Sequence, residues 1–405
     1  MRFLPASATP DARRLIAARG LRAVGDGFVS VLLPAYLLEL GLDAFAVGIV
    51  STAALLGSAL LTLAVGATAA SRARRTLLLA GSALMVATGL AFAGLSGFWP
   101  LLVIAFLGTI NPSAGDVTVF LPLEHTLLTD TVADVDRTAL FARYSLVGSM
   151  LAAAGTLLAA LPETLGVSAG FARLDAMRLM FVLYAAIGLG AACLYGTLSR
   201  PAPAAAARPV APLGPSKAIV FRMAALFSLD SFGSGFFVQS LLALWLFDRF
   251  GLSLAAAATV FFWMNVLNAF SFLLAARIAA RIGLINTMVF THIPANLCVM
   301  LLPFVDQLWL ALALLMGRGL LSQMDVPTRT SYVMAVVTPE ERPAAASVTA
   351  VPRSLAAAAA PMLAGYLFKL SPFGWPLLIG GALKIAYDLA LLALFRHIRP
   401  PEEMR

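Results

Sequence analysis

This sequence has few charged residues. Only 12% of its 405 residues are Asp, Glu, Lys or Arg, whereas 61% are hydrophobic and the mean hydropathy is +0.92. Soluble domains contain about 25% charged and about 45–50% apolar residues. The composition therefore excludes a water-soluble globular protein and indicates a chain that crosses a membrane several times.

Cysteine and histidine are also scarce. Cys193 and Cys298 both lie in apolar runs, and with three histidines they form no disulfide framework and no metal-binding spacing. The chain contains no phosphate-binding glycine loop and no nucleophile with a base beside it. We therefore expect no cofactor, no metal and no enzymatic activity. The net charge of +8 is spread over short loops, which argues against a nucleic-acid partner.

Long apolar runs, by contrast, are abundant. A helix that spans a bilayer needs about 20 apolar residues. Twelve runs qualify, at about 15–38, 44–67, 76–96, 99–128, 138–161, 174–198, 220–247, 253–279, 284–304, 307–337, 343–368 and 374–396. The Pro/Ala-rich segment 199–219 follows the sixth run and has the composition of a solvated linker. We predict an all-α membrane protein with two six-helix bundles, residues 1–198 and 220–405, joined by this linker.

Basic residues are distributed unevenly between the two sides of the predicted membrane. The loops on one side hold 17 Lys or Arg, and those on the other side hold 4. Cytoplasmic loops are the ones enriched in Lys and Arg. We therefore expect a multi-pass protein of the inner (plasma) membrane with both termini and the linker in the cytoplasm.

The two halves of the sequence repeat each other. Asp116 returns as Asp325 after 209 residues, and Arg143 in the next span returns as Arg353 after 210. The tetrapeptide Gly-Asp-Gly-Phe at 25–28 returns in similar form 208 residues later, as Gly-Ser-Gly-Phe. An even number of spans per repeat makes the halves parallel, related by an axis along the membrane normal.

With this architecture the chain resembles the major facilitator superfamily. That family's motif between spans two and three, Gly-x-x-x-Asp-Arg/Lys-x-Gly-Arg/Lys-Arg/Lys, is matched at 66–75 by Gly-Ala-Thr-Ala-Ala-Ser-Arg-Ala-Arg-Arg, in which Ala70 replaces the aspartate. The resemblance implies a secondary transporter whose central cavity opens alternately to either side, lined mainly by spans 1, 4, 7 and 10. It also implies that another contact must replace the cytoplasmic latch that the aspartate provides.

Four charges inside the spans are candidates for that contact. A charge in hydrocarbon costs about 2.5–3.5 kcal/mol on insertion scales, so each needs a partner or an aqueous path. We predict the ion pairs Asp116–Arg143 and Asp325–Arg353, formed within each half or crossed between the halves. Static pairs between neighbouring helices, a gate that closes the cytoplasmic side, and direct solute binding all remain open.

Asp26 and Asp230 are candidates for proton coupling. Both lie near the predicted midplane, where a carboxylate without a fixed partner can take up a proton near neutral pH. Arg22 lies one turn before Asp26 and is an available partner. Asp230 has no basic residue one turn away, so it is the stronger candidate.

Further polar side chains in the spans are candidate solute ligands. They are Arg22, Arg318, Arg329, Gln239, Asn265, Asn268 and Gln323. Arg318 stays charged near the midplane, so it needs either an acid such as Asp230 or an anionic ligand. Lys384 and Asp388 are four residues apart and are predicted to pair, and Glu124 is expected near the membrane interface.

The embedded charges nearly balance, with seven basic against six acidic groups. This favours an anionic, zwitterionic or polar solute over a simple cation. We predict a monomeric, proton-coupled secondary transporter that moves a small polar, charged or amphiphilic solute by alternating access. A lean towards export, as an antiporter, rests on the family resemblance alone. The alternatives are an uncoupled facilitator and a membrane sensor on the same scaffold.

Overall fold

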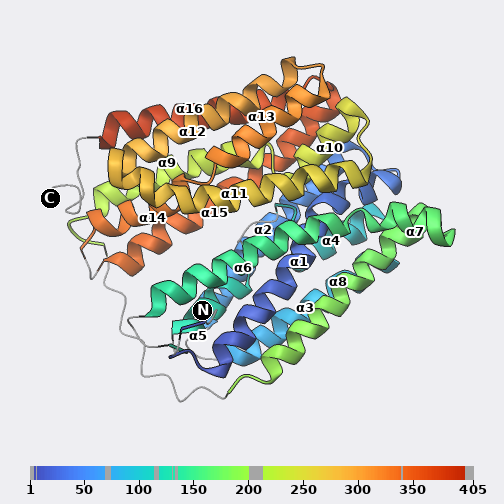
Figure 1. Ribbon diagram of the computed structural model, residues 1–405, viewed down its shortest axis with the longest axis horizontal. Helices are drawn as coiled ribbons and strands as arrows, with labels where there is room; N and C mark the ends of the chain where they lie inside the picture. Colours follow the sequence, from blue (N-terminus) through green and yellow to red (C-terminus); the bar gives the residue numbers. More distant parts are fainter. Residues whose placement is uncertain are drawn as a thin grey trace.

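The computed structural model describes residues 4–5, 7–68, 74–113, 118–129, 131–132, 136–199, 213–338 and 341–396. Within them every regular element is a helix, which confirms the all-α class (Figure 1). The N-terminal half contains α1 (Pro10–Glu39), α2 (Ala44–Thr68), α3 (Arg74–Gly94), α4 (Phe98–Leu107), α5 (Phe120–Thr129), α6 (Arg137–Leu158), α7 (Leu161–Ala169) and α8 (Arg173–Gly196). The C-terminal half contains α9 (Lys217–Gly235), α10 (Gln239–Phe250), α11 (Leu254–Ile282), α12 (Leu284–Leu301), α13 (Leu308–Leu321), α14 (Asp325–Val336), α15 (Arg342–Leu370) and α16 (Trp375–Phe395), with a 3-10 turn at Leu302–Phe304.

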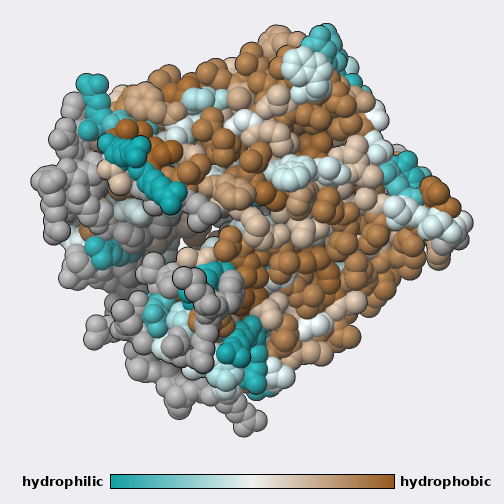
Figure 2. Space-filling model, viewed as in Figure 1, coloured by the Kyte–Doolittle hydropathy of each residue, from teal (hydrophilic) through white to brown (hydrophobic). Residues whose placement is uncertain are grey.

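The predicted spans coincide with single helices or with consecutive helices. The fourth, seventh and tenth spans are interrupted, giving the pairs α4/α5, α9/α10 and α13/α14. Nine helical segments of the described chain are long and apolar enough to cross a membrane. Apolar residues also dominate the visible face between the two ends of the molecule (Figure 2). The count of twelve spans fits this segmentation and stays a prediction.

The helices form two groups, α1–α8 and α9–α16, which diverge towards the end that holds the N and C labels (Figure 1). We call this end the termini end and the opposite end the far end. The division agrees with the predicted halves, although most of the predicted linker 199–219 lies outside the described residues. The exact domain boundaries therefore stay a prediction.

The close helix packing of the N-terminal half is repeated in the C-terminal half, at positions that the sequence repeat relates to each other. A Cβ on Gly27 of α1 would lie 2.2 Å from the carbonyl oxygen of Ala152 in α6. A Cβ on Gly235 of α9, the counterpart 208 residues later, would lie 2.5 Å from the carbonyl oxygen of Ala357 in α15. Small residues allow membrane helices to approach this closely. The same helix pair in each half thus depends on the same glycine.

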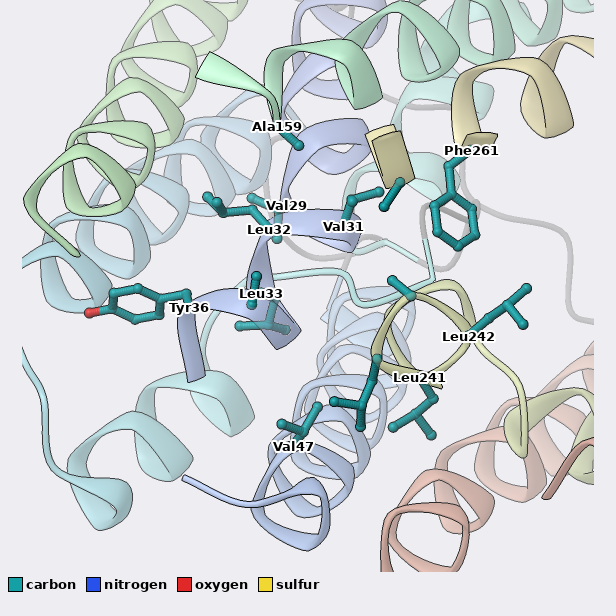
Figure 3. Close-up of a cluster of buried hydrophobic side chains, with 14 of the residues drawn as sticks. Val29, Val31, Leu32, Leu33, Tyr36, Val47, Ala159, Leu241, Leu242 and Phe261 are labelled. Atoms are coloured by element: carbon teal, nitrogen blue, oxygen red, sulfur yellow. The ribbon is translucent and has the colours of Figure 1, made fainter. Parts of the chain in front are cut away.

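An apolar cluster joins the two halves towards the far end. Side chains of α1 and α2, including Leu33 and Val47, lie in one cluster with Leu241 and Leu242 of α10 and Phe261 of α11 (Figure 3). Each of these five side chains is buried. The cluster therefore excludes water from the seam between the halves.

Backbones of the two halves also touch beside this cluster. A Cβ on Gly48 of α2 would lie 2.5 Å from the carbonyl oxygen of Pro361 and 2.9 Å from the Cα of Gly365, both in α15. One turn further along α2, the Oγ1 of Thr52 accepts a hydrogen bond from the backbone N–H of Met362 at 2.9 Å. Helices α2 and α15 are therefore in direct backbone contact.

Two acids complete the far-end seam. The Nζ of Lys369 lies 2.8 Å from the Oδ2 of Asp43, and this hydrogen bond holds the pKa of Asp43 below its ordinary value. Glu163 of α7 accepts the backbone N–H groups of Leu254 and Ala255 at 2.6 and 3.0 Å, which caps the N-terminus of α11 from the other half. The far end is closed by these contacts.

Candidate functional site

A cavity of about 480 Å³ lies between the two halves. Arg19 of α1, Leu121 of α5 and Ser149 of α6 contribute to its wall from the N-terminal half, and the rest of the wall comes mainly from α9 to α16. Sites for small molecules measure about 300–1,000 Å³. The cavity is therefore large enough for a small organic solute.

The interruptions of the fourth, seventh and tenth spans meet at this cavity. Its wall includes Ser113 after α4, Phe237 and Val238 between α9 and α10, and Ser322 and Gln323 between α13 and α14. Non-helical backbone at membrane depth is tolerated where it lines a cavity or is buried in protein. The broken helices and the cavity are thus parts of one feature.

Most of the residues singled out from the sequence lie on the cavity wall. These are Asp230, Asp325, Arg353, Arg318, Arg329, Gln239, Asn265, Asn268 and Gln323. Arg22 and Asp26 instead line a separate cavity of about 10 Å³ within the N-terminal half. That volume holds about one water molecule. The roles predicted for all these residues stay predictions.

The predicted Asp116–Arg143 pair is not tested by the structure. Asp116 lies outside the described residues. Arg143 is placed on α6, and its Nη1 is buried without a hydrogen-bond partner in the part of the chain that is described. The pair therefore stays a prediction.

Asp230 is the centre of a buried ionic cluster. Its Oδ1 accepts a hydrogen bond from the Nζ of Lys384 at 2.6 Å, and its Oδ2 accepts one from the Nη1 of Arg329 at 3.2 Å. The side chain of Asp230 is only 6% exposed. The expectation of a carboxylate without a fixed partner is therefore wrong, because the two cations come from α16 and α14 rather than from its own helix.

The predicted pair between Asp325 and Arg353 is also wrong. Asp325 lies 3.1 Å from the Nη1 of Arg329, one turn along α14. Residues four apart share a helix face, so this short local contact prevails over a reach to α15. Among the described residues, no acid forms an ion pair with Arg353.

His292 of α12 is a site residue that sequence reasoning missed. Its Nδ1 lies 2.9 Å from the Oδ1 of Asp388, and its Nε2 lies 3.9 Å from the Oδ1 of Asp230. Asn296 adds a weak hydrogen bond to Asp388 at 3.4 Å. The predicted Lys384–Asp388 pair is therefore wrong, since Lys384 binds Asp230 instead. His292 and Asp388 are 96 residues apart, so no local spacing could reveal their contact.

The N-terminal half contains a second buried cluster, around Glu124. This carboxylate pairs with Arg22 and also accepts hydrogen bonds from the hydroxyls of Tyr144 and Tyr195, the latter at 2.5 Å. Glu124 is 0% and Arg22 is 1% exposed. Glu124 is therefore buried within the bundle, and its predicted position near the membrane interface stays a prediction. Counting depth along one helix could not foresee this burial, because both tyrosines come from other helices, α6 and α8.

Comparisons with known proteins agree with this architecture. The sequence model of the Major Facilitator Superfamily matches residues 15–320. An uncharacterized membrane protein of Saccharomyces cerevisiae, YJR124C, is 23% identical over 96% of this chain and 94% of its own length.

Several solved transporter structures share the fold. The nucleoside transporter NupG has a TM-score of 0.74 at 14% identity, covering 96% of this chain and 100% of its own. A bacterial homologue of the human lysosomal transporter Spinster, in an inward-facing and occupied conformation, has a TM-score of 0.73 at 16% identity, covering 96% and 97%. The human organic anion transporter MFSD10 has a TM-score of 0.65 at 17% identity, covering 95% and 100%. At these identities the likeness shows the fold alone.

The family resemblance inferred from the sequence is thereby confirmed, because the family's model matches well over half of the chain. The apolar helices and the relative described as a membrane protein agree with several passes through a bilayer. This chain therefore belongs to the Major Facilitator Superfamily and is a multi-pass membrane transport protein.

Proposed function

We propose that this protein moves a small polar, charged or amphiphilic solute by alternating access through the cavity of about 480 Å³. The observation that carries the proposal is the position of this cavity. It lies between two halves that are held together at the far end and diverge at the termini end (Figure 1). A solute on the cavity wall would reach the far side only when the far-end seam opens.

The chemistry of the far-end seam suits reversible opening. Its ion pair between Asp43 and Lys369 has both side chains about half exposed, and such pairs contribute little to stability. The backbone contact between Gly48 and Gly365 holds the helices without any side chain to disentangle. In the opposite state, we propose that the termini end closes by new contacts of Arg353 and its neighbours, as a gate.

We also propose that transport is coupled to protons through the cluster around Asp230. This cluster contains three carboxylates and two fixed cations, together with His292. It therefore carries one net negative charge when the imidazole is neutral and none when it is protonated. Asp26 remains the second candidate for the proton site, and export remains the proposed direction.

Cysteine labelling in sealed vesicles tests alternating access without knowledge of the solute. We would introduce Gln323→Cys on the cavity wall after replacing Cys193 and Cys298 by Ala. Alternating access predicts that membrane-impermeant thiol reagents label this cysteine from either side. A short thiol bridge between Asp43→Cys and Lys369→Cys should abolish labelling from the far side only. Without the bridge, labelling from one side alone would refute the proposal, and so would far-side labelling that persists after the bridge is formed.

A transport assay then separates the coupled carrier from the uncoupled facilitator. Thermal stabilisation of the purified protein by metabolites and drugs would first identify a solute. Movement of that solute in proteoliposomes should respond to an imposed pH gradient if protons are coupled. Equal rates with and without the gradient would favour the facilitator.

A further inference from the structure

We propose that the transported solute is an organic anion whose acidic group is bound by Arg318 of α13 and Arg353 of α15. This inference rests on the proposed transport function and adds the class of substrate. It starts from the charge of the cavity wall. The fixed positive charges there are Arg19, Arg318, Arg329, Arg353 and Lys384, whereas the fixed negative charges are Asp230 and Asp325.

Two of these cations already have acidic partners. Lys384 and Arg329 both bind Asp230, and Arg329 also binds Asp325. Arg19, in the N-terminal half, packs with its guanidinium 5.7 Å from the ring centre of Tyr144. The positive excess of the wall therefore includes Arg318 and Arg353.

Neither Arg318 nor Arg353 forms an ion pair with an acid in the described part of the chain. The guanidinium of Arg318 lies 5.2 Å from the ring centre of Phe237, which is a cation–π contact. Such a contact offsets only part of the free energy that removing an ion from water costs. An arginine cannot lose its proton to avoid that cost. Within the described residues, the cavity thus presents two cations that no acid contacts in an ion pair.

The cluster around Asp230 shows that this fold can supply acids to embedded cations. Arg329 is contacted by two aspartates on different helices, whereas Arg318 has none among the described residues. Guanidinium groups bind carboxylates and phosphates through paired hydrogen bonds. An anionic solute would therefore bring the counter-charge that the wall lacks.

The rest of the wall defines the body of the solute. Phe261, Met264, Asn265 and Asn268 project into the cavity from one face of α11, and Leu242 of α10 adds apolar surface. Apolar groups and two amides on the same wall fit a solute with an apolar body and hydrogen-bonding substituents. The substrate class is thus an amphiphilic organic acid that carries a carboxylate, phosphonate or sulfonate.

Matched probes that differ only in charge test this inference. We would measure the thermal stability of the purified full-length protein with 3-phenylpropionate, 3-phenylpropionamide and 3-phenylpropylamine, each at millimolar concentration, neutral pH and constant ionic strength. A ligand that binds only the folded protein raises its melting temperature. We expect stabilisation by the carboxylate, and little or none by the amide and the amine.

Variants then assign the effect to the two arginines. Hydrogen bonds to charged groups contribute about 1.5–3 kcal/mol, so Arg318→Gln and Arg353→Gln should each weaken binding of 3-phenylpropionate roughly 10- to 100-fold. Arg318→Lys should retain part of the affinity. Arg222→Gln is the matched control, because Arg222 is exposed on α9 and does not line the cavity.

Three results would overturn the inference. They are equal or stronger stabilisation by the amide or amine, unchanged binding of the carboxylate after loss of both arginines, and no stabilisation by any of the three probes. None of these results bears on whether the cavity opens to both sides, which cysteine labelling measures separately. Conversely, labelling from one side alone would refute transport even if the carboxylate binds.

Discussion

Replacing Glu124 by Gln tests whether Arg22 holds the N-terminal half together or binds solute. In the structure the guanidinium of Arg22 is buried against the Glu124 carboxylate, away from the wall of the large cavity. The substitution removes one charge and keeps the shape of the side chain. It therefore leaves a buried guanidinium without its counter-charge.

The expected loss of stability is large. Arg22 is 1% and Glu124 is 0% exposed, so water cannot replace the missing charge without opening the bundle. Removing one partner of a buried pair costs about 3–5 kcal/mol. The Gln side chain still offers an acceptor to Tyr144 or Tyr195, which places the expected cost towards the lower figure. For a half of this size the melting temperature should fall on the order of 10 °C.

The assay is thermal unfolding of purified protein in detergent, combined with binding of 3-phenylpropionate. The double variant Arg22→Gln/Glu124→Gln should be more stable than Glu124→Gln alone, because removal of both charges leaves neither one uncompensated. Glu39→Gln is the matched control, since Glu39 forms a partly exposed pair with Arg173 and its loss should change little. Probe binding should be unchanged in the folded fraction of all three variants.

A Glu124→Gln variant that melts like the parent protein would refute this reasoning. If that variant also lost probe binding, Arg22 would be a solute ligand, as the sequence suggested. A double variant less stable than Glu124→Gln would also contradict this reasoning, because the uncompensated guanidinium would then not be what destabilises Glu124→Gln.

Three further predictions concern coupling and closure. His292→Gln should abolish the response of transport to a pH gradient, whereas His125→Gln should not; a response that survives would exclude the proposed proton site. Gly365→Ala should increase labelling of a cavity cysteine from the far side, because its Cβ would lie 2.6 Å from a backbone oxygen of α2. Gly196→Ala is its control, since a Cβ there meets nothing within 4 Å. The pKa of Asp43 is lowered in the closed seam. Its ion pair with Lys369 therefore stabilises the closed seam fully at pH values above the ordinary aspartate pKa. This stabilisation is lost as the pH falls through the lowered pKa of Asp43. Far-side labelling should therefore rise on strong acidification, with a smaller rise in Asp43→Asn.

Much of the architecture could be predicted because it depends on one-dimensional properties of the chain. A helix in a bilayer satisfies its own backbone hydrogen bonds, so the length of an apolar run is enough to predict a span. Duplication is likewise visible as a constant offset, from Asp116 to Asp325 and from Arg143 to Arg353. Charged groups within apolar runs indicated where an aqueous cavity would lie.

The partners of those charges could not be predicted in the same way. Spacing along one helix reveals neighbours three or four residues away, such as Asp325 and Arg329. It does not show whether such neighbours pair with each other or with residues of another helix. The contacts of Asp230 with Lys384 and of Arg22 with Glu124 join helices far apart in sequence. Local spacing does not distinguish these partners from the predicted ones, such as Arg353 for Asp325 and Asp388 for Lys384.

The sequence by itself thus determined that this protein lies in a lipid bilayer, that it is helical, that its two halves repeat each other, and that charged residues lie within its spans. Tertiary structure decided which charges neutralise each other, which end of the molecule is closed, and that Arg318 and Arg353 line a shared cavity without an ion pair to any acid of the described segments. The physical reason is range. Hydrophobicity acts on each residue wherever it lies in the chain, whereas an ion pair forms only where folding brings two side chains within a few ångströms.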